Sequence, residues 1–241
     1  MHIIFLLLVI IYLMVTAVSD ARKTKELIGR PITEKVRVKF YIETIILGWA
    51  SVLAVMAMCV IAKANFEDIG FRLISLNYNI WFSIITFVLC GVLLLGSLYQ
   101  VVSYLTNAKY REAIKEKFAG GTDENQYDAV VNLLVPRSKK EKQVFFWVSL
   151  TAGVGEEILL RGFLFYLLGA IFPGISMIVV VLISGALFGI WHLYQGLQGV
   201  IRTTISGILF GCLFLASGSL IPAILLHFLL DLSSAFLLAE E

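Results

Sequence analysis

The chain has little charge and few cysteines or histidines. Charged side chains make up 15% of its 241 residues, 59% are hydrophobic, and the mean hydropathy is +0.91. Soluble globular domains are typically about 45–50% apolar and about 25% charged. The composition therefore excludes a soluble globular domain and predicts one integral membrane domain over residues 1–241, with no room for a second sizeable soluble domain.

Cysteine chemistry has little support in this sequence. Cys59, Cys90 and Cys212 all lie in apolar runs, and none belongs to a CxxC pair. This spacing argues against a disulfide framework and against a cysteine metal site. We expect the three thiols to act as small apolar residues that face other helices or lipid.

Long hydrophobic runs dominate the chain. Seven of them are candidates for membrane-spanning helices, namely residues 3–18, 41–62, 80–105, 144–171, 175–193, 200–216 and 220–238. The first is predicted to be a retained helix, because only His2 precedes it and no small-x-small cleavage site follows it. If the long run 144–171 breaks in two, there is an eighth span. We therefore predict an all-α polytopic bundle of about seven to eight spans.

A polar stretch separates the third run from the fourth. Residues 106–143 mix charged and apolar side chains at roughly helical spacing. Short amphipathic helices on the membrane surface would fit this pattern, and so would a small soluble hairpin. Residues 1–143 are accordingly predicted to hold the N-terminal helices and the cytoplasmic loops.

The basic residues predict the orientation of the chain. Of nineteen lysines and arginines, seven lie in residues 22–39 and eight in residues 109–142. Positively charged loops stay in the cytoplasm, and three helices before the second loop place both loops on one side. We therefore expect the N-terminus outside, and the C-terminus, residues 239–241, in the cytoplasm.

Ionisable residues occur inside the apolar runs, almost all of them in the last ninety residues. A charged side chain at the centre of a bilayer costs at least about 2.5–3.5 kcal/mol, so such residues are functional candidates. Glu43 and Arg202 lie near helix ends, where snorkelling explains them. The deep group is Glu156, Glu157, Arg161, His192, His227 and Asp231.

The spacing of this group predicts its contacts. Glu157 and Arg161 are four residues apart and can pair on one helix face, which leaves Glu156, about 100° around the helix, free for chemistry. His227 and Asp231 have the same spacing, so the carboxylate can accept from the imidazole and fix its tautomer.

Another pair with this spacing is Phe188 and His192, in which the aromatic ring can pack on the imidazole. Glu156 and His227 are predicted near mid-depth of the bilayer and His192 closer to the cytoplasm. These levels fit a polar cavity that opens toward the cytoplasm. A free glutamate, two histidines and an aspartate on three helices are what amide hydrolysis within a membrane requires, because water must be deprotonated and an oxyanion stabilised.

These residues also resemble the motifs of a known family. Glu156-Glu157-x-x-x-Arg161 resembles the EExxxR motif of the CPBP family, which comprises type II CAAX prenyl proteases and bacteriocin-processing or immunity (ABI) proteins. Phe188-x-x-x-His192 is similar to its FxxxH motif, and His227-x-x-x-Asp231 to its Hxxx(N/D) motif. The resemblance covers a CPBP-like core at residues 144–238.

The resemblance implies an intramembrane endopeptidase whose catalytic helices surround the polar cavity. Glu156 would activate the water and His192 would help to place it, while His227 and Asp231 would form the oxyanion site. Glu157 and Arg161 would hold the site together. The prenyl-protein proteases carry Asn where this chain has Asp231; an ionised Asp cannot donate to an oxyanion and would instead orient His227, or act while protonated.

Several alternatives stay open at this stage. No cofactor is expected, although Glu156, His192 and His227 could bind zinc. The expected partners are the lipid bilayer and a peptide or C-terminally prenylated (CAAX-type) protein substrate, with no nucleic acid. The competing functions are an inactive scaffold or immunity protein of the same fold, and a small transporter, which would predict repeat symmetry and broken helices in both halves.

Overall fold

The computed structural model describes residues 1–28, 32–76, 78–119 and 126–235, and within these ranges it is all-helical without β-strands. The N-terminal helices are α1 (His2–Leu27), α2 (Glu34–Ala62), α3 (Ile80–Thr106), α4 (Ala108–Ala119) and α5 (Gln126–Leu134). The C-terminal elements are α6 (Lys139–Glu157), η1 (Ile158–Phe163), α7 (Leu164–Ile171), α8 (Met177–Trp191), η2 (Leu193–Gln195), α9 (Gly196–Ser217) and α10 (Leu220–Ser234).

Over the described residues, each of the seven predicted runs coincides with helix, so the predicted all-α fold class is confirmed. The run 144–171 is not broken, because α6 continues through η1 into α7. By length and composition, four described helices can cross a membrane: His2–Leu27, Glu34–Ala62, Ile80–Thr106 and Leu193–Ser217. Met177–Trp191 and Leu220–Ser234 are shorter apolar helices, and the number of spans stays a prediction. The predicted cytoplasmic C-terminus, residues 239–241, lies outside the described residues.

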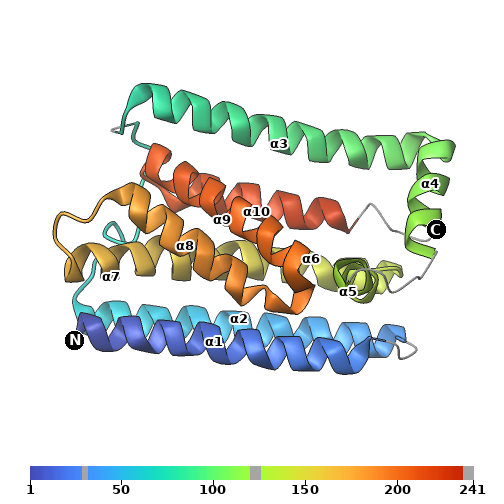
Figure 1. Cartoon of the computed structure of the whole chain (residues 1–241), viewed down its shortest axis with the longest axis horizontal. Helices are drawn as coiled ribbons and strands as arrows, with labels where there is room; N and C mark the ends of the chain where they lie inside the picture. Colours follow the sequence, from blue (N-terminus) through green and yellow to red (C-terminus); the bar gives the residue numbers. More distant parts are fainter. Residues whose placement is uncertain (29–31, 77, 120–125, 236–241) are drawn as a thin grey trace.

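The long helices lie side by side along the longest axis (Figure 1). In this view α1 and α2 form one edge and α3 the other, with α6 to α10 between them. The end of α1 and the start of α2 lie at the same end of the bundle as α4 and α5. Both basic segments are therefore at one end of the bundle, which is the arrangement assumed for the predicted orientation.

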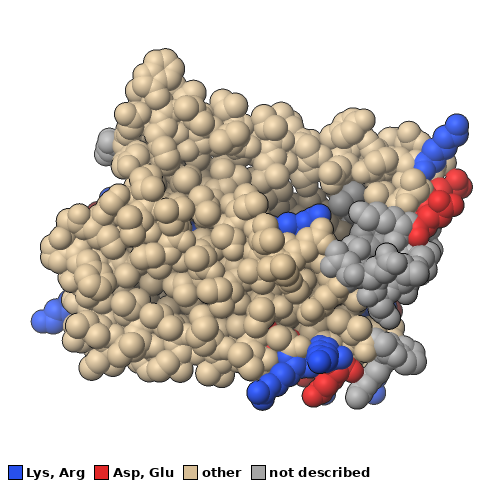
Figure 2. Space-filling model, in the orientation of Figure 1, with Lys and Arg blue, Asp and Glu red and all other residues tan. Residues whose placement is uncertain are grey.

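The surface matches a protein surrounded by lipid. The face in Figure 2 is almost uncharged, and most of its charged side chains gather at the end that carries α4 and α5. On α3, large apolar side chains such as Trp81 and Leu95 are 70% and 67% exposed. Because no water is available to solvate polar groups in the hydrocarbon region, an apolar exterior of this kind suits a membrane. The chain is an integral membrane protein.

The polar stretch between α3 and α6 contributes the short helices α4 and α5. The next helix, α6, starts in a capping box in which the Ser138 hydroxyl accepts from the Glu141 backbone N–H and the Glu141 carboxylate accepts from the Ser138 backbone N–H. The same carboxylate accepts a 2.8 Å hydrogen bond from Nε of Arg37 on α2. The start of α6 is thereby fixed to α2.

Glycines allow the helices of the C-terminal half to approach closely. A Cβ added at Gly153 would lie 3.1 Å from the Ile224 carbonyl oxygen on α10, and one added at Gly185 would lie 3.0 Å from the Ile208 backbone nitrogen on α9. Small residues at such crossings are typical of helix packing in membranes. This close packing brings the side chains of α6, α8 and α10 into one cluster.

Candidate active site

Three helices supply the residues that the sequence singled out. Glu156, Glu157 and Arg161 come from the junction of α6 and η1. Phe188 lies on α8 with His192 directly after its last residue, and His227 and Asp231 lie on α10. Side-chain contacts join all three groups, so the structure places every predicted site residue in one cluster.

The helix that carries the first motif changes its winding within the motif. Ile158–Phe163 form a π-helical segment, and all six residues are buried. Segments of this kind are rare and frequently occur at functional sites. Gly162 is required here, because a Cβ would lie 2.8 Å from the Ile69 carbonyl oxygen. Nothing in the sequence predicted this widened turn.

The predicted ion pair between Glu157 and Arg161 is confirmed. Both side chains are 0% exposed, and Arg161 Nη1 donates to Glu157 Oε1 at 2.9 Å. Nη2 of the same guanidinium donates to the Gly207 carbonyl oxygen at 2.8 Å. The guanidinium carbon also lies 4.7 Å from the ring centre of Phe188 and 5.5 Å from that of Phe210, within cation–π range. Arg161 thus joins η1 to α8 and α9.

His227 is oriented by a different carboxylate from the one that its helical spacing suggested. Its Nδ1 lies 2.9 Å from Glu157 Oε1, so Nδ1–H donates to that oxygen. Asp231 Oδ2 lies 3.7 Å from Nε2, too far for a hydrogen bond. The expected Asp231 contact is therefore replaced by one between helices, because the packing of α10 on α6 brings Glu157 closer. Phe210 stacks on the imidazole, with ring centres 4.8 Å apart.

His192 is held by its own helix. Its Nδ1 lies 2.8 Å from the Phe188 carbonyl oxygen, which can only accept, so Nδ1 carries the proton. Nε2 of the neutral ring is then the acceptor, and it faces Glu156 Oε2 at 3.9 Å. The predicted packing of Phe188 on this imidazole is confirmed, with ring centres 4.5 Å apart.

Glu156 lies between the two imidazoles. Its Oε2 is 3.9 Å from His192 Nε2 and 4.0 Å from His227 Nε2, and it accepts no hydrogen bond from the described residues. Polar groups separated by more than about 3.5 Å are often bridged by water. The separations are too long for direct hydrogen bonds, and a water that enters the site would join Glu156 to either imidazole.

The exposed fraction of the side chains increases across the site, from the Glu157–Arg161 pair to Asp231. Glu157 and Arg161 are fully buried, the side chains of His227, His192 and Glu156 are 6%, 14% and 20% exposed, and that of Asp231 is 40% exposed. The structural ion pair therefore forms the base of the site, and Asp231 lies on its open side.

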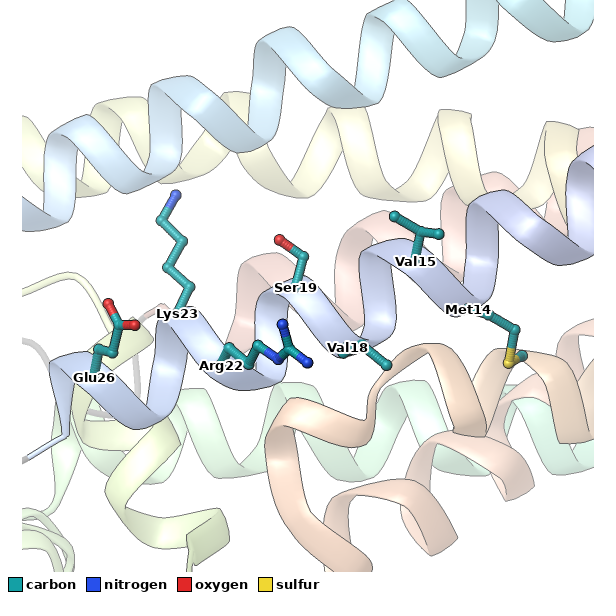
Figure 3. A pocket seen from close by; sticks show the side chains of 7 residues that line it. All are labelled: Met14, Val15, Val18, Ser19, Arg22, Lys23 and Glu26. Atoms are coloured by element: carbon teal, nitrogen blue, oxygen red, sulfur yellow. The ribbon is translucent and has the colours of Figure 1, made fainter.

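A separate cavity of about 640 Å³ runs along α1, away from this cluster (Figure 3). It is lined by Met14, Val15, Val18, Ser19, Arg22, Lys23 and Glu26. Figure 3 shows Lys23 pointing toward the neighbouring α2, where it pairs with Glu43. None of the predicted site residues lines this cavity, which separates it from the chemistry.

The fit of a zinc ion was tested on the donor atoms. Zinc bound at about 2.0–2.1 Å by a tetrahedral set of donors holds them about 3.4 Å apart. The Glu156 oxygen is 3.9 Å and 4.0 Å from the two imidazole nitrogens, about half an ångström wider. Among the described residues, no group of three or more His, Cys, Asp or Glu side chains is arranged to hold a metal ion.

Sequence reasoning missed the residues of α9. Gly207 supplies the carbonyl that accepts from Arg161, and Phe210 stacks on His227. The run that holds them has no ionisable residue in its interior, so the cost of burying charge does not single it out. Their spacing of three residues, which puts both on one helix face, was the available signal.

Fold and site together define a helical membrane protein with a buried Glu–Arg–His network and a glutamate between two imidazoles. Residues 140–233 match a family model described as type II CAAX prenyl endopeptidase Rce1-like. This part of the chain is similar to that family, in agreement with the resemblance of the three motifs, and the family is one of proteases. The match runs from α6 into α10 and includes every predicted site residue. No curated protein and no solved structure matches the chain.

Proposed function

We propose that the chain is an intramembrane endopeptidase that hydrolyses a peptide bond with water activated by Glu156. The observation that carries this proposal is the position of the Glu156 carboxylate. One of its oxygens has no hydrogen-bond partner among the described residues and lies within 4.0 Å of two imidazole nitrogens. A partly buried carboxylate in such a position is suited to general base catalysis.

His192 supports this step by placing the water. Its Nδ1–H is occupied by the Phe188 carbonyl, so its Nε2 accepts one proton of a water whose other proton points to Glu156 Oε2. The 3.9 Å gap matches a single bridging molecule. The lone pair of the water oxygen then faces the substrate carbonyl carbon.

His227 supplies the charge for the oxyanion. Three carboxylates surround its ring, with Glu157 at 2.9 Å, Asp231 at 3.7 Å and Glu156 at 4.0 Å. Carboxylates this close favour the imidazolium form. With Nδ1–H donated to Glu157, Nε2–H is available to donate to the developing oxyanion. Asp231 contributes by stabilising the imidazolium, a role that an aspartate can fill in this motif without donating a hydrogen bond.

The reaction balances with these groups alone. The water oxygen bonds to the carbonyl carbon while one water proton passes to Glu156. The carbonyl oxygen becomes the oxyanion and accepts from His227. When the tetrahedral intermediate collapses, the carbon–nitrogen bond breaks and Glu156 returns the proton to the leaving amine. Glu157 and Arg161 hold the three motif helices in place throughout.

No metal is required by this mechanism. If zinc were bound, Glu156, His192 and His227 would hold it, and it would supply Lewis-acid polarisation of the carbonyl. The separations of these donors suit a water-bridged arrangement better than direct coordination. The proposed reaction is therefore independent of a metal ion.

The proposed substrates are membrane-associated proteins or proteins with a C-terminal prenylated CAAX sequence. The family match supports this class of substrate. The partly exposed groups of the site lie among apolar helices. A substrate with a lipid anchor is held in the same bilayer by that anchor, which brings its cleavage site close to these groups.

A cleavage assay tests the proposal. The protein is purified in detergent and incubated with quenched fluorescent peptides, among them a farnesylated CAAX peptide, with and without a chelator. Glu156→Gln is compared with the wild type, and Glu67→Gln, an exposed carboxylate between α2 and α3, is the matched control. We expect Glu156→Gln to lose at least about a hundredfold in kcat, the size of a general base contribution.

The outcomes separate the alternatives. The glutamate mechanism is supported if cleavage is lost in Glu156→Gln but not in Glu67→Gln, and if a chelator does not change cleavage by the wild type. Loss with chelator in the wild type, restored by zinc, moves the reaction to a metal. Cleavage that survives Glu156→Gln overturns the role of that residue. No cleavage of any peptide favours an inactive member of the family.

A further inference from the structure

Among the side chains that the structure describes, no lysine or arginine pairs with the two carboxylates on the open side of the site, which share one cation, the His227 imidazolium. Together with Glu157 they are three carboxylates against two cations, so one negative charge is in excess. Glu156 is 20% exposed and Asp231 is 40% exposed. Within the described part of the chain, their ion-pair contacts are with His192 and His227, and none is with lysine or arginine. Arg161, the cation at the base of the site, is 0% exposed.

The positive charge of Arg161 is therefore buried, whereas the negative charges of Glu156 and Asp231 are partly exposed. The guanidinium of Arg161 donates to Glu157 and to the Gly207 carbonyl. It is also fully buried, so a substrate cannot reach it. What a substrate meets at the opening is a carboxylate of Asp231 and, beyond it, that of Glu156. In an environment of low dielectric constant, unscreened charges of one sign repel like charges and attract opposite ones strongly.

We propose that Asp231 selects substrates that carry lysine or arginine within two residues of the scissile bond, and disfavours acidic residues there. This inference rests on the proposed function, because it uses the same site. Asp231 Oδ2 lies 3.7 Å from His227 Nε2, the proposed donor to the oxyanion. A hydrogen bond of about 2.8 Å from that nitrogen puts the scissile carbonyl oxygen within about 6.5 Å of the carboxylate.

This distance limits which substrate positions are affected. Adjacent Cα atoms are about 3.8 Å apart, so only residues one or two positions from the scissile bond can present a side chain to Asp231. The flexible four-carbon stem of lysine can bring its ammonium to the carboxylate, whereas residues farther along the chain lie beyond the site. The preference is thus expected at a single substrate position or at two adjacent ones.

The expected effect is about fivefold in binding. Exposed ion pairs contribute up to about 1 kcal/mol, or about fivefold at 25 °C, and partial burial increases this. A lysine peptide should therefore bind about fivefold more tightly than its glutamine counterpart, and the glutamate counterpart more weakly still. Raising the salt concentration should reduce the difference.

The test measures binding separately from cleavage. Full-length Glu156→Gln protein, which is expected not to cleave, is titrated with dye-labelled peptides in which Lys, Gln or Glu occupies each of six central positions in turn. Fluorescence anisotropy gives the Kd values. The same titrations are made with Asp231→Asn and Asp231→Glu, each added to Glu156→Gln. Gel filtration and thermal unfolding check that each variant is folded.

The expected result is a lysine preference at one or two positions, lost in Asp231→Asn and kept in Asp231→Glu. A merely structural role for Asp231 would change all three peptides alike and would leave their ratios intact. A preference that survives Asp231→Asn, or the absence of a lysine preference at every position, overturns the inference. Wild-type cleavage of the glutamine peptides reports on the proposed function independently.

Discussion

Replacing Arg161 by methionine is expected to destabilise the protein by about 3 kcal/mol. The side chain is 0% exposed and donates at 2.9 Å and 2.8 Å, to Glu157 and to the Gly207 carbonyl. Removing one member of a buried ion pair typically costs about 3–5 kcal/mol, because the remaining charge is left uncompensated. The lower end applies here, since His227 still donates to Glu157.

A second variant separates the lost charge balance from lost packing. Adding Glu157→Gln to Arg161→Met removes the uncompensated carboxylate, and the amide oxygen can still accept from His227 Nδ1. We expect the double variant to recover about 1–2 kcal/mol relative to Arg161→Met, because neutral replacements of buried pairs are often well tolerated. Both variants should lose cleavage, since His227 would no longer be held in the same charged surroundings.

Thermal unfolding in detergent, followed by tryptophan fluorescence or by size-exclusion chromatography after heating, is the assay. At about 2–4 °C per kcal/mol for a chain of this length, Arg161→Met should lower Tm by roughly 6–12 °C. Arg22→Met, which alters an exposed arginine on α1, is the control and should change Tm little. A Tm within about 2 °C of the wild type for Arg161→Met, or a double variant less stable than the single one, would refute the reasoning.

Two further predictions concern α9 and the start of α6. Gly207→Ala should lower stability by about 1–3 kcal/mol and reduce kcat, because a Cβ would lie 2.9 Å from the Phe188 ring and 3.1 Å from Arg161 Nη2; thermal unfolding and the peptide assay measure this. Glu141 lies before the predicted span; burial raises the pKa of its carboxyl, but hydrogen bonds from Arg37 and from two backbone N–H groups outweigh burial and lower it. The contribution of Glu141 to stability is therefore present above about pH 4.5 and lost as the pH falls further. Glu141→Gln should lower the free energy of unfolding at neutral pH and make it depend less on pH in acid. Unfolding at a series of pH values measures both effects.

Matched variants control for both predictions. Gly91→Ala adds a Cβ on α3 where no atom lies within 4 Å, and it should leave stability and kcat unchanged. Glu34→Gln removes a carboxylate that is 47% exposed and only 4.0 Å from Lys140, so it should not change the acid dependence. An equal loss in Gly91→Ala, or the same acid dependence in Glu141→Gln as in the wild type, would contradict the corresponding argument.

The sequence by itself determined the helical membrane architecture and the chemical groups of the site. Apolar runs of about twenty residues leave the backbone no alternative to helix in lipid, because every N–H and C=O must be satisfied internally. The cost of burying charge made Glu156, Glu157, Arg161, His227 and Asp231 conspicuous. Pairs within one helix, such as Glu157 with Arg161, followed from the period of 3.6 residues.

Contacts between helices were decided only by the tertiary structure. The sequence pattern paired His227 with Asp231 on α10, whereas packing gave its hydrogen bond to Glu157 on α6. Gly207 and Phe210 entered the site because α9 crosses η1 and α10 closely, and no helical period encodes which helix becomes a neighbour. The free oxygen of Glu156 between two imidazoles likewise exists only once three helices have packed, since its neighbours are 36 and 71 residues away in the chain.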